Sequence, residues 1–254
     1  MKDQLRRASA SLRNSSWWRL YRAHDLKHRP RGPLAGPHNE WSVIYTPLPA
    51  VMPTRLVDLV LEAGAAARDW DLSSVTDRHP NRVELDIWPG EHYKLLPALA
   101  RSWGAKTVVE VGTYRGASAL ALSTEPSIKR IVTFDLLPWS RFEPTYLTST
   151  DVGDRIHQEL GDLADPTVFT QHAALINSAE MLFVDAPKDG VFEPRFVELL
   201  LKQSPSVDQL IVFDDIRVLT MIELWRDLQL DKLDVTSFGH WSGTGLAIRP
   251  AGTA

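Results

Sequence analysis

The sequence of 254 residues contains no cysteine, and this absence excludes several kinds of chemistry at once. Disulfide frameworks, thiolate nucleophiles and cysteine-based zinc or iron–sulfur sites are all ruled out. The chain also lacks an apolar run near the roughly 20 residues that a membrane-spanning helix needs. Its first residues lack the apolar core of a secretory signal, because Arg6, Arg7 and Arg13 interrupt it. These absences predict a cytoplasmic protein without a membrane span.

Neither sign of charge dominates the chain, since 28 Lys and Arg face 32 Asp and Glu, for a formal net charge of −4. This balance gives no reason to expect a nucleic acid as partner. Residues 1–52 differ, because they form a basic extension that contains Trp17 and Trp18. The extension either packs on the main domain or on a second subunit, which would allow a homodimer, or it forms a contact surface for an acidic substrate, a membrane surface or a nucleic acid. Residues 53–254 are predicted to form the main domain.

Apolar residues recur at helical spacing in segments 53–69 and 91–103, and Gly104 is expected to end the second helix. Short apolar segments then alternate with helical ones. The predicted strands are Thr107–Val111, Arg130–Phe134, Arg155–Glu159, Glu180–Val184 and Gln209–Phe213. The predicted helices between and after them are Ala117–Leu122, Pro144–Thr150, Pro166–Leu175, Glu193–Lys202 and Leu219–Leu228.

This alternation is typical of an α/β protein, in which a mostly parallel sheet is covered by helices on both faces. The last two predicted strands, Asp234–Phe238 and Gly245–Arg249, flank a turn that contains Gly239 and Gly243. We therefore expect the sheet to end in an antiparallel hairpin. The predicted fold is a doubly wound, seven-stranded sheet over residues 105–254, preceded by the helices of residues 53–104.

Two glycines, Gly112 and Gly116, lie between the first predicted strand and the helix that follows it. Glycine lets the backbone turn sharply and approach a ligand, and parallel sheets bind ligands at the carboxyl ends of their strands. Dinucleotide-binding proteins have a glycine where this chain has Glu110, so a cationic ligand without phosphate is favoured, such as S-adenosylmethionine. Asp135, at the tip of the second strand, suits the hydroxyls of a ribose.

On these residues the chain resembles the class I S-adenosylmethionine-dependent methyltransferases, which have a Rossmann-like fold, over about residues 90–250. The resemblance implies a set of residues along the methionine end of the cofactor: Glu110, Gly112, Tyr114, Gly116 and Ser118. It also implies that Asp135 binds the ribose hydroxyls and that Asp162, after the third strand, contacts the adenine. The closing hairpin is that superfamily's usual departure from other doubly wound sheets.

Acidic residues follow the fourth and fifth strands, where Asp185 ends one segment and Asp214 and Asp215 end the next. Both tips should lie at the same edge of a parallel sheet, and three uncompensated carboxylates there are electrostatically costly. Either a cation lies among them, or some are protonated or point away. Oxygen ligands without cysteine or clustered histidine favour Mg²⁺, Mn²⁺ or Ca²⁺ over zinc. The sequence therefore predicts a divalent-cation site, with Mg²⁺ as the first candidate.

The pattern of Asp185, Lys188, Asp214 and Asp215 resembles the metal-dependent O-methyltransferases, of the catechol, caffeoyl-CoA and antibiotic-sugar types. The resemblance implies that Asp185 lies beside the cofactor and that Lys188 is the general base toward a hydroxyl of a small molecule. Asp185 is the alternative base, and Lys188 could instead only pair with a neighbouring acid. Asp215 stands where asparagine is commoner and Pro187 stiffens the loop, which leaves a phenolic, sugar or other natural-product acceptor open.

His240 and Trp241 lie in the predicted hairpin turn, where related enzymes build part of the acceptor pocket, although a turn histidine can also be merely solvated. Trp88 and His92, ahead of the first strand, could form a lid or pack in the core. Two other functions stay open. One is a metal-independent methyltransferase with Asp185 or His240 as base, and the other is a non-catalytic relative of the fold that serves assembly.

Overall fold

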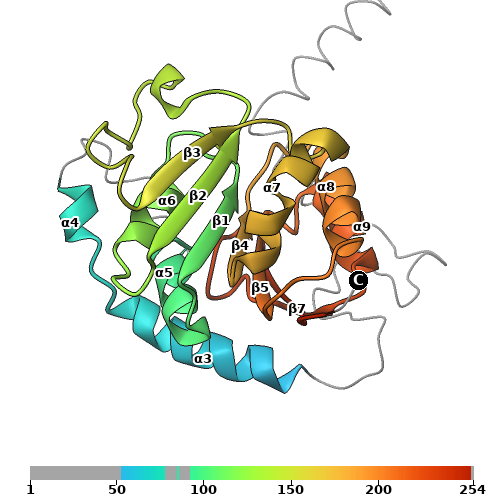
Figure 1. Cartoon of the computed structure of the whole chain (residues 1–254). Coiled ribbons are helices and arrows are strands. Elements are labelled where there is room, and N and C mark those ends of the chain that lie inside the picture. The colour runs from blue at the N-terminus through green and yellow to red at the C-terminus, as the bar shows by residue number, and fades with distance from the viewer. Residues whose placement is uncertain (1–52, 78–84, 86–91, 253–254) are drawn as a thin grey trace, which may run out of the picture. The chain divides into compact units, whose positions relative to one another are not determined.

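The computed structural model of the protein describes residues 53–77, 85 and 92–252. Within this part of the chain, seven strands form one sheet in the order β3-β2-β1-β4-β5-β7-β6 (Figure 1). The strands are β1 (Thr107–Val111), β2 (Arg130–Asp135), β3 (Ile156–Leu160), β4 (Met181–Val184), β5 (Gln209–Asp214), β6 (Asp231–Asp234) and β7 (Thr244–Arg249). The helices are α3 (Thr54–Arg68), α4 (Ser73–Thr76), α5 (His92–Trp103), α6 (Ala117–Ser123), η2 (Trp139–Arg141), α7 (Pro166–Ser178), α8 (Phe192–Leu201) and α9 (Leu219–Asp227).

Five neighbouring strands of the sheet are parallel, and of the seven described strands only β7 runs in the opposite direction. β1 lies at the centre and pairs in parallel with β2 and β4, while β3 and β5 extend the parallel part on either side. β7 pairs antiparallel with both β5 and β6. The doubly wound sheet with an antiparallel hairpin is thus confirmed, and all five parallel strands lie within one or two residues of their predicted bounds.

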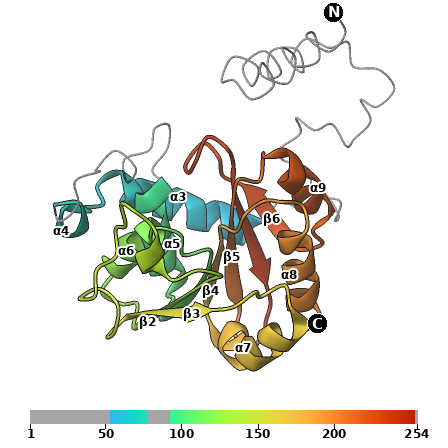
Figure 2. The same ribbon diagram turned by 90° about the horizontal axis from the view of Figure 1, so that it is seen from above.

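Each face of the sheet carries its own apolar core, because side chains alternate between the two faces of a strand. Val108 of β1 packs into the cluster that includes residues of α3, α5 and α6. Val109, the next residue, packs into the second cluster with residues of α7, α8 and α9. Figures 1 and 2 show these two sets of helices on opposite sides of the sheet. The inner strands β1, β4 and β5 are therefore buried on both faces, which is why their sequences are mostly apolar, whereas the edge strands β3 and β6 are partly exposed and carry polar residues.

Local signals fix the ends of several helices. Asp165 caps α7 by accepting hydrogen bonds from the N–H groups of Thr167 and Val168 at 2.7 and 3.2 Å, as expected of a capping carboxylate. Gly104 follows α5 with a φ of +81°, which confirms it as the residue that ends this helix in the left-handed conformation.

The helix predicted at Pro144–Thr150 is wrong, because this segment is irregular. The N–H of Tyr146 donates to the carbonyl of Arg115 at 2.9 Å, and Asp151 accepts a hydrogen bond from the N–H of Thr148 at 2.9 Å. Tyr146 and Leu147 are buried against the main core. The backbone N–H groups that would bond within a helix donate instead to the side chain of Asp151 and to the distant carbonyl of Arg115.

The first strand of the hairpin begins earlier than predicted, at Asp231 instead of Asp234, and Val235–Phe238 forms a turn. The reason is Lys232, which is 5% exposed although it lies in a strand. Its ammonium donates to the carbonyls of Trp225, Arg226 and Leu228, which are among the last carbonyls of α9 and lack partners within the helix. A buried lysine that satisfies a helix end cannot be distinguished from a solvated one by sequence pattern.

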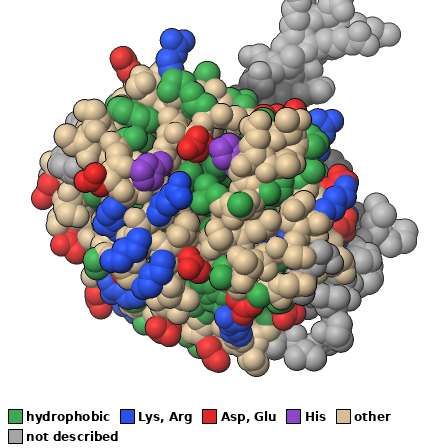
Figure 3. Space-filling model, viewed as in Figure 1, with side chains coloured by type: hydrophobic (Ala, Val, Ile, Leu, Met, Phe, Trp, Pro, Cys, Tyr) green, Lys and Arg blue, Asp and Glu red, His purple; other side chains and the backbone are tan. Residues whose placement is uncertain are grey.

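No helix among the described residues is long and apolar enough to cross a membrane. The face drawn in Figure 3 carries acidic and basic side chains together with apolar ones, and no single sign of charge covers it.

Candidate functional site

A cavity of about 390 Å³ opens at the carboxyl ends of β1, β2 and β4. Its wall includes Val111 and Gly112 after β1, Phe134 and Asp135 at the end of β2, and Asp185 after β4. This is the crevice in which open α/β sheets bind their ligands, and its volume is typical of small-molecule sites.

The turn after β1 approaches β4 so closely that only glycine fits. Gly112 has a φ of +105°, and a Cβ built there would lie 2.0 Å from the backbone oxygen of Asp185. Both neighbours are fixed by the sheet, because the N–H of Gly112 donates to the carbonyl of Phe134 and that of Asp185 to the carbonyl of Val111, each at 2.8 Å. The glycine thus serves the close approach of two backbone segments at the cavity wall, where the sequence predicted that it serves the approach of a ligand.

Asp135 connects the tip of β2 to the turn after β1. One carboxylate oxygen accepts from the N–H of Tyr114 at 2.8 Å, and the other accepts from the N–H of Leu137 at 3.1 Å. A carboxylate oxygen has more than one acceptor position, so a ligand hydroxyl can still bond to it. Asp135 thus both shapes the cavity wall and offers an acceptor to a ligand in it.

The outer wall of the cavity is apolar and aromatic. The rings of Tyr114 and Phe142 meet edge to face at 4.9 Å, and Leu136, Leu163 and Phe192 also line this wall. Tyr114 is 55% exposed and Leu136 is 68% exposed. Large apolar side chains left open to solvent beside a cavity mark a surface that a flat or apolar ligand group can cover.

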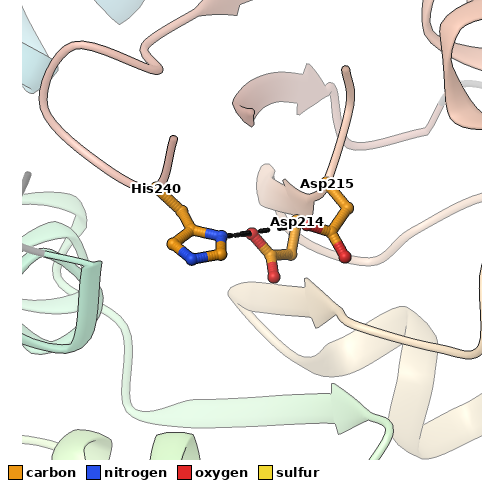
Figure 4. A group of neighbouring side chains, drawn as sticks. All are labelled: Asp214, Asp215 and His240. Atoms are coloured by element: carbon orange, nitrogen blue, oxygen red, sulfur yellow. Dashed lines mark ion pairs between the residues drawn. The ribbon is translucent and has the colours of Figure 1, made fainter. Parts of the chain in front are cut away.

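A second group of side chains lies at the ends of β5 and of the β6–β7 connection. Nδ1 of His240 lies 3.8 Å from Oδ1 of Asp214 and 3.8 Å from Oδ1 of Asp215 (Figure 4). Ser242 connects them further, because its hydroxyl contacts Nδ1 of His240 at 2.5 Å and donates to Asp215. One potential ligand atom from each of Asp214, Asp215 and His240 lies within 4.8 Å of the others.

Lys188 connects this group to the cavity. Its ammonium forms an ion pair with Asp185 and a second with Oδ2 of Asp215, at 3.0 Å. Burial lowers the pKa of Lys188, but the charges of Asp185, Asp214 and Asp215 outweigh burial and raise it above its ordinary value. Lys188 is therefore a cation near neutral pH in this arrangement.

The two aspartates after β5 have opposite protonation preferences. The pKa of Asp214 is raised well above its ordinary value, first by burial and then by the charges of Asp185 and Asp215. Burial acts in the same direction on Asp215, but hydrogen bonds from His240 and Ser242 and the charge of Lys188 lower its pKa overall. Asp215 is thus the ionised partner of Lys188, whereas Asp214 favours the protonated form more than an ordinary aspartate does.

The sequence model of the O-methyltransferase family matches residues 70–224, which is more than half of the chain. This protein belongs to the O-methyltransferase family. Membership implies S-adenosylmethionine as methyl donor and a small molecule as acceptor, in agreement with the resemblance seen in the sequence. No curated protein sequence matches the chain.

Solved structures share the fold of this O-methyltransferase. A Staphylococcus aureus protein described as a candidate caffeoyl-CoA O-methyltransferase is 14% identical with a TM-score of 0.50, and the match covers 77% of this chain and 98% of that one. The SAH-bound methyltransferase PaMTH1 of Podospora anserina is 19% identical with a TM-score of 0.49, covering 80% and 100%. A methyltransferase of Geobacter sulfurreducens is 20% identical with a TM-score of 0.46, covering 71% and 91%.

Some residues that the sequence assigned to the cofactor lie beneath the cavity wall of this O-methyltransferase. Glu110 is fully buried and accepts a hydrogen bond from Ser118. Burial raises the pKa of Glu110 to about 8, against the hydrogen bonds from Ser118 and Thr133 that lower it. A Cβ on Gly116 would contact the side chain of Leu147 at 2.2 Å. These residues support the turn from below, while Gly112 and Tyr114 line the cavity itself.

The remaining predicted residues have mixed positions. The carboxylate of Asp162 accepts from the N–H of Ala164 at 2.8 Å, while its neighbours Gly161 and Leu163 line the cavity. Trp241 is 64% exposed, with its ring 5.6 Å from that of His240. The predictions for residues 1–52, for Trp88 and for the side chain of His92 lie outside the described residues.

Sequence reasoning missed Ser242 and Glu193. Ser242 follows His240 by two residues in a turn, where a serine carries no distinguishing signal. Glu193 lies in the first turn of α8 and accepts a hydrogen bond from the N–H of Lys188 at 2.7 Å. An acid in the first turn of a helix is usually explained by the helix dipole, so only its burial, at 1% exposure, distinguishes it.

Proposed function

We propose that this O-methyltransferase transfers the methyl group of S-adenosylmethionine to a hydroxyl of a small phenolic, sugar or other natural-product acceptor, assisted by a divalent cation. The observation that carries the proposal is the double role of Asp185. The residue lines the cavity after β1 and β4, and its carboxylate contacts Lys188, which in turn contacts Asp215. A donor in the cavity and an acceptor at the acidic group would therefore meet at Asp185.

The cavity suits the parts of S-adenosylmethionine in a definite order. Asp135 offers carboxylate oxygens for the ribose hydroxyls, and the exposed wall of Tyr114, Leu136 and Phe142 suits the flat adenine. We assign the methionine part to the cavity wall formed by Gly112 and Asp185. We assign Glu110, Gly116 and Ser118 to the support of this turn, and Asp162 to the adenine end through its own short loop.

The acidic group fits a divalent cation by its donors. Asp214 and Asp215 offer carboxylate oxygens and His240 a ring nitrogen within 4.8 Å of one another, and Asp185 is joined to this group through the ammonium of Lys188. With all three aspartates ionised, as ligands of a cation would be, they exceed the single charge of Lys188, and hard oxygen donors of this kind prefer Mg²⁺. Such an ion, when bound, makes a coordinated hydroxyl more acidic and orients it. We assign Asp185, Asp214 and Asp215 as its ligands.

Two groups can take the proton of the acceptor hydroxyl. The first is Lys188, whose contacts place its nitrogen between Asp185 and Asp215. Since these carboxylates keep Lys188 protonated, its action as a base requires that their charge be offset. The second is Asp185, the carboxylate that also lines the cavity. We keep Lys188 as the first candidate and Asp185 as the alternative.

A metal-independent reaction is the second candidate, and the hydrogen-bonded series of His240, Ser242 and Asp215 favours it. In this version His240 accepts the proton and Asp215 orients the ring through Ser242, as a carboxylate orients a general base in other enzymes. Trp241, exposed beside His240, would contact the acceptor in either version. The cytoplasmic location and the homodimer predicted from the sequence stay predictions.

Calorimetry and chelation test the proposal in two steps. Titration with S-adenosylmethionine should show one site per chain, and a folded protein without binding would refute both versions. Methyl transfer to catechol, caffeoyl-CoA and methyl glucoside is then measured before and after removal of metals with EDTA, and again after adding Mg²⁺. Loss on chelation with recovery on Mg²⁺ supports the cation, whereas full activity after chelation supports the metal-independent version.

Asp214→Ala separates the two halves of the site. Because Asp214 does not line the cavity, the variant should bind S-adenosylmethionine within about two-fold of the wild type yet lose about 100-fold or more in the rate constant for methyl transfer. Asp208→Ala, at an exposed ion pair with Arg55, is the matched control and should change neither value. An equal loss of binding and turnover in Asp214→Ala would contradict this division.

A further inference from the structure

The backbone of Lys188 adopts a conformation that an L-residue rarely adopts. Its φ is +54°, in the left-handed region where the side chain crowds its own carbonyl. Such a conformation persists only where the surrounding structure holds it. Contacts with the surrounding structure must therefore hold the backbone of Lys188, and they determine where its ammonium lies.

Both backbone polar groups of Lys188 are bound, each by a different helix. The N–H donates to Oε1 of Glu193 at 2.7 Å, from the first turn of α8. The carbonyl accepts from the hydroxyl of Thr220 at 2.6 Å, from the first turn of α9. The two peptide units on either side of the Lys188 Cα are therefore each held by one hydrogen bond, which restricts both backbone torsions of Lys188.

Glu193 is an unusual residue for this task. It is 1% exposed, and glutamate is seldom fully buried unless it is paired. Its second oxygen, Oε2, is also buried and has no hydrogen-bond partner among the described residues. The apolar contacts of α8 come from Phe196 and Leu200, so helix packing does not require a carboxyl at position 193. The bond to Lys188 is what the buried carboxyl provides.

The loop before α8 brings Glu193 back to Lys188. Asp189 holds the loop in a turn before α8 by accepting from the N–H groups of Val191 and Phe192 at 2.8 and 2.9 Å. Gly190, with a φ of +81°, lets the chain reverse between them. Five residues after Lys188, the chain thus returns an acceptor to its N–H.

We propose that Glu193 and Thr220 are positioning residues that hold Lys188 in its left-handed conformation. In this conformation the side chain turns back on the loop, so that the ammonium reaches Asp185, three residues earlier, and Asp215 on the neighbouring strand end. The inference rests on the proposed function, in which Lys188 acts at the reacting end of the site. Neither Glu193 nor Thr220 contacts the reacting atoms in this scheme.

The test compares Glu193→Leu, which removes the acceptor, with Glu193→Gln, which keeps one. The contacts of Glu193 and Thr220 with the backbone of Lys188 are called the clamp below. Exchange of the Lys188 amide hydrogen with solvent is measured by NMR on protein labelled with ¹⁵N-lysine, in which Lys188→Arg identifies the signal. This measurement reports on the clamp without requiring methyl transfer. Glu193→Leu should speed this exchange at least about ten-fold, and its rate constant for methyl transfer to catechol should fall by up to about 100-fold. Affinity for S-adenosylmethionine should stay within about two-fold, and Glu193→Gln should restore both values.

Two further variants complete the design. Thr220→Val removes the hydrogen bond to the carbonyl of Lys188. Because Thr220 is exposed, this variant tests the clamp even if Glu193→Leu does not fold. Thr220→Ser keeps the hydroxyl and should restore the wild-type exchange and rate. Glu198→Leu, on the same helix but in an exposed ion pair with Lys202, is the matched control and should leave exchange and rate unchanged.

The outcomes separate the inference from the function on which it rests. Unchanged exchange at Lys188 in Glu193→Leu and Thr220→Val would overturn the clamp, even if the protein is an active methyltransferase. Equal impairment of Glu193→Gln and Glu193→Leu would also overturn it, because the hydrogen-bond acceptor would then not be what matters. A wild-type protein that binds no S-adenosylmethionine would refute the proposed function, while the exchange experiment would still decide on the clamp.

Discussion

Gly112→Ala should damage both stability and cofactor binding, because it places a methyl group against backbone. The Cβ would lie 2.0 Å from the carbonyl oxygen of Asp185 and 2.8 Å from its carbonyl carbon. Neither atom can withdraw easily, since the N–H of Asp185 is bonded to Val111 in the β1–β4 pairing and the N–H of Gly112 is bonded to Phe134. Relief therefore requires that the end of β1 separates from β4.

The cost has two parts of similar size. Alanine at a φ of +105° is strained by about 1–3 kcal/mol, and forcing a methyl into filled space adds about 1–3 kcal/mol. Their sum, about 2–6 kcal/mol, is a large share of the roughly 5–15 kcal/mol that stabilises a typical protein. At about 2–4 °C per kcal/mol, the melting temperature should fall by roughly 10 °C.

Thermal unfolding by circular dichroism and calorimetry with S-adenosylmethionine measure the two effects. If the variant relaxes its turn in the free state and binding requires the native turn again, about 3 kcal/mol of strain is subtracted from the binding free energy. The affinity then falls about 100-fold. Gly104→Ala is the matched control, because its φ is +81° but a Cβ there has nothing within 4 Å, so it carries the backbone strain alone. Equal losses of stability in the two variants, or an unchanged affinity in Gly112→Ala, would refute the close-approach argument.

Two other predictions follow from buried and exposed side chains. Burial raises the pKa of Glu110 to about 8, above its value in the unfolded chain. The contribution of Glu110 to the free energy of unfolding is therefore complete below about pH 4.5 and is lost as the pH rises through about 8. The loss amounts to at most roughly 5 kcal/mol. Urea denaturation of the free protein should show this decline, and Glu110→Gln should flatten it; a decline of equal slope in the variant would contradict the assignment. Trp241→Ala, at a 64% exposed position, should leave the melting temperature and cofactor affinity unchanged but raise the KM for the acceptor, and an unchanged KM would remove Trp241 from the acceptor site.

The parallel sheet could be predicted from the sequence because its signals are local. The inner strands β1, β4 and β5 are short, mostly apolar runs between turn residues, and β1 begins and ends at the predicted residues, Thr107 and Val111. The predicted helices after β1, β3, β4 and β5 are present as α6, α7, α8 and α9, and the prediction was wrong only at Pro144–Thr150, where a distant group competes for the backbone. The segment after Pro144 gives the N–H of Tyr146 to Arg115, and nothing near that segment in the sequence indicates this partner.

The candidate site shows the same division. That Asp185, Asp214 and Asp215 converge could be predicted, since the order of strands in a parallel sheet brings their tips together. The partners of these residues could not, because they come from other parts of the fold. Ser242 reaches Asp215 across 27 positions and Thr220 reaches Lys188 across 32, and both are ordinary hydroxyl residues in turns or first helical turns.

Asp185 is the residue at which binding and chemistry can be separated by experiment. Its backbone carbonyl closes the cavity against Gly112, and this contact is fixed by the β1–β4 pairing regardless of the side chain. Its carboxylate instead faces Lys188 and begins the acidic group. Under the proposed function, a change at Gly112 should act on the donor through the backbone of Asp185, whereas a change at Lys188 should act on the acceptor through the carboxylate of Asp185. One effect involves the backbone of Asp185 and the other involves its carboxylate. Loss of donor affinity and loss of turnover should therefore be independent in the variants described above.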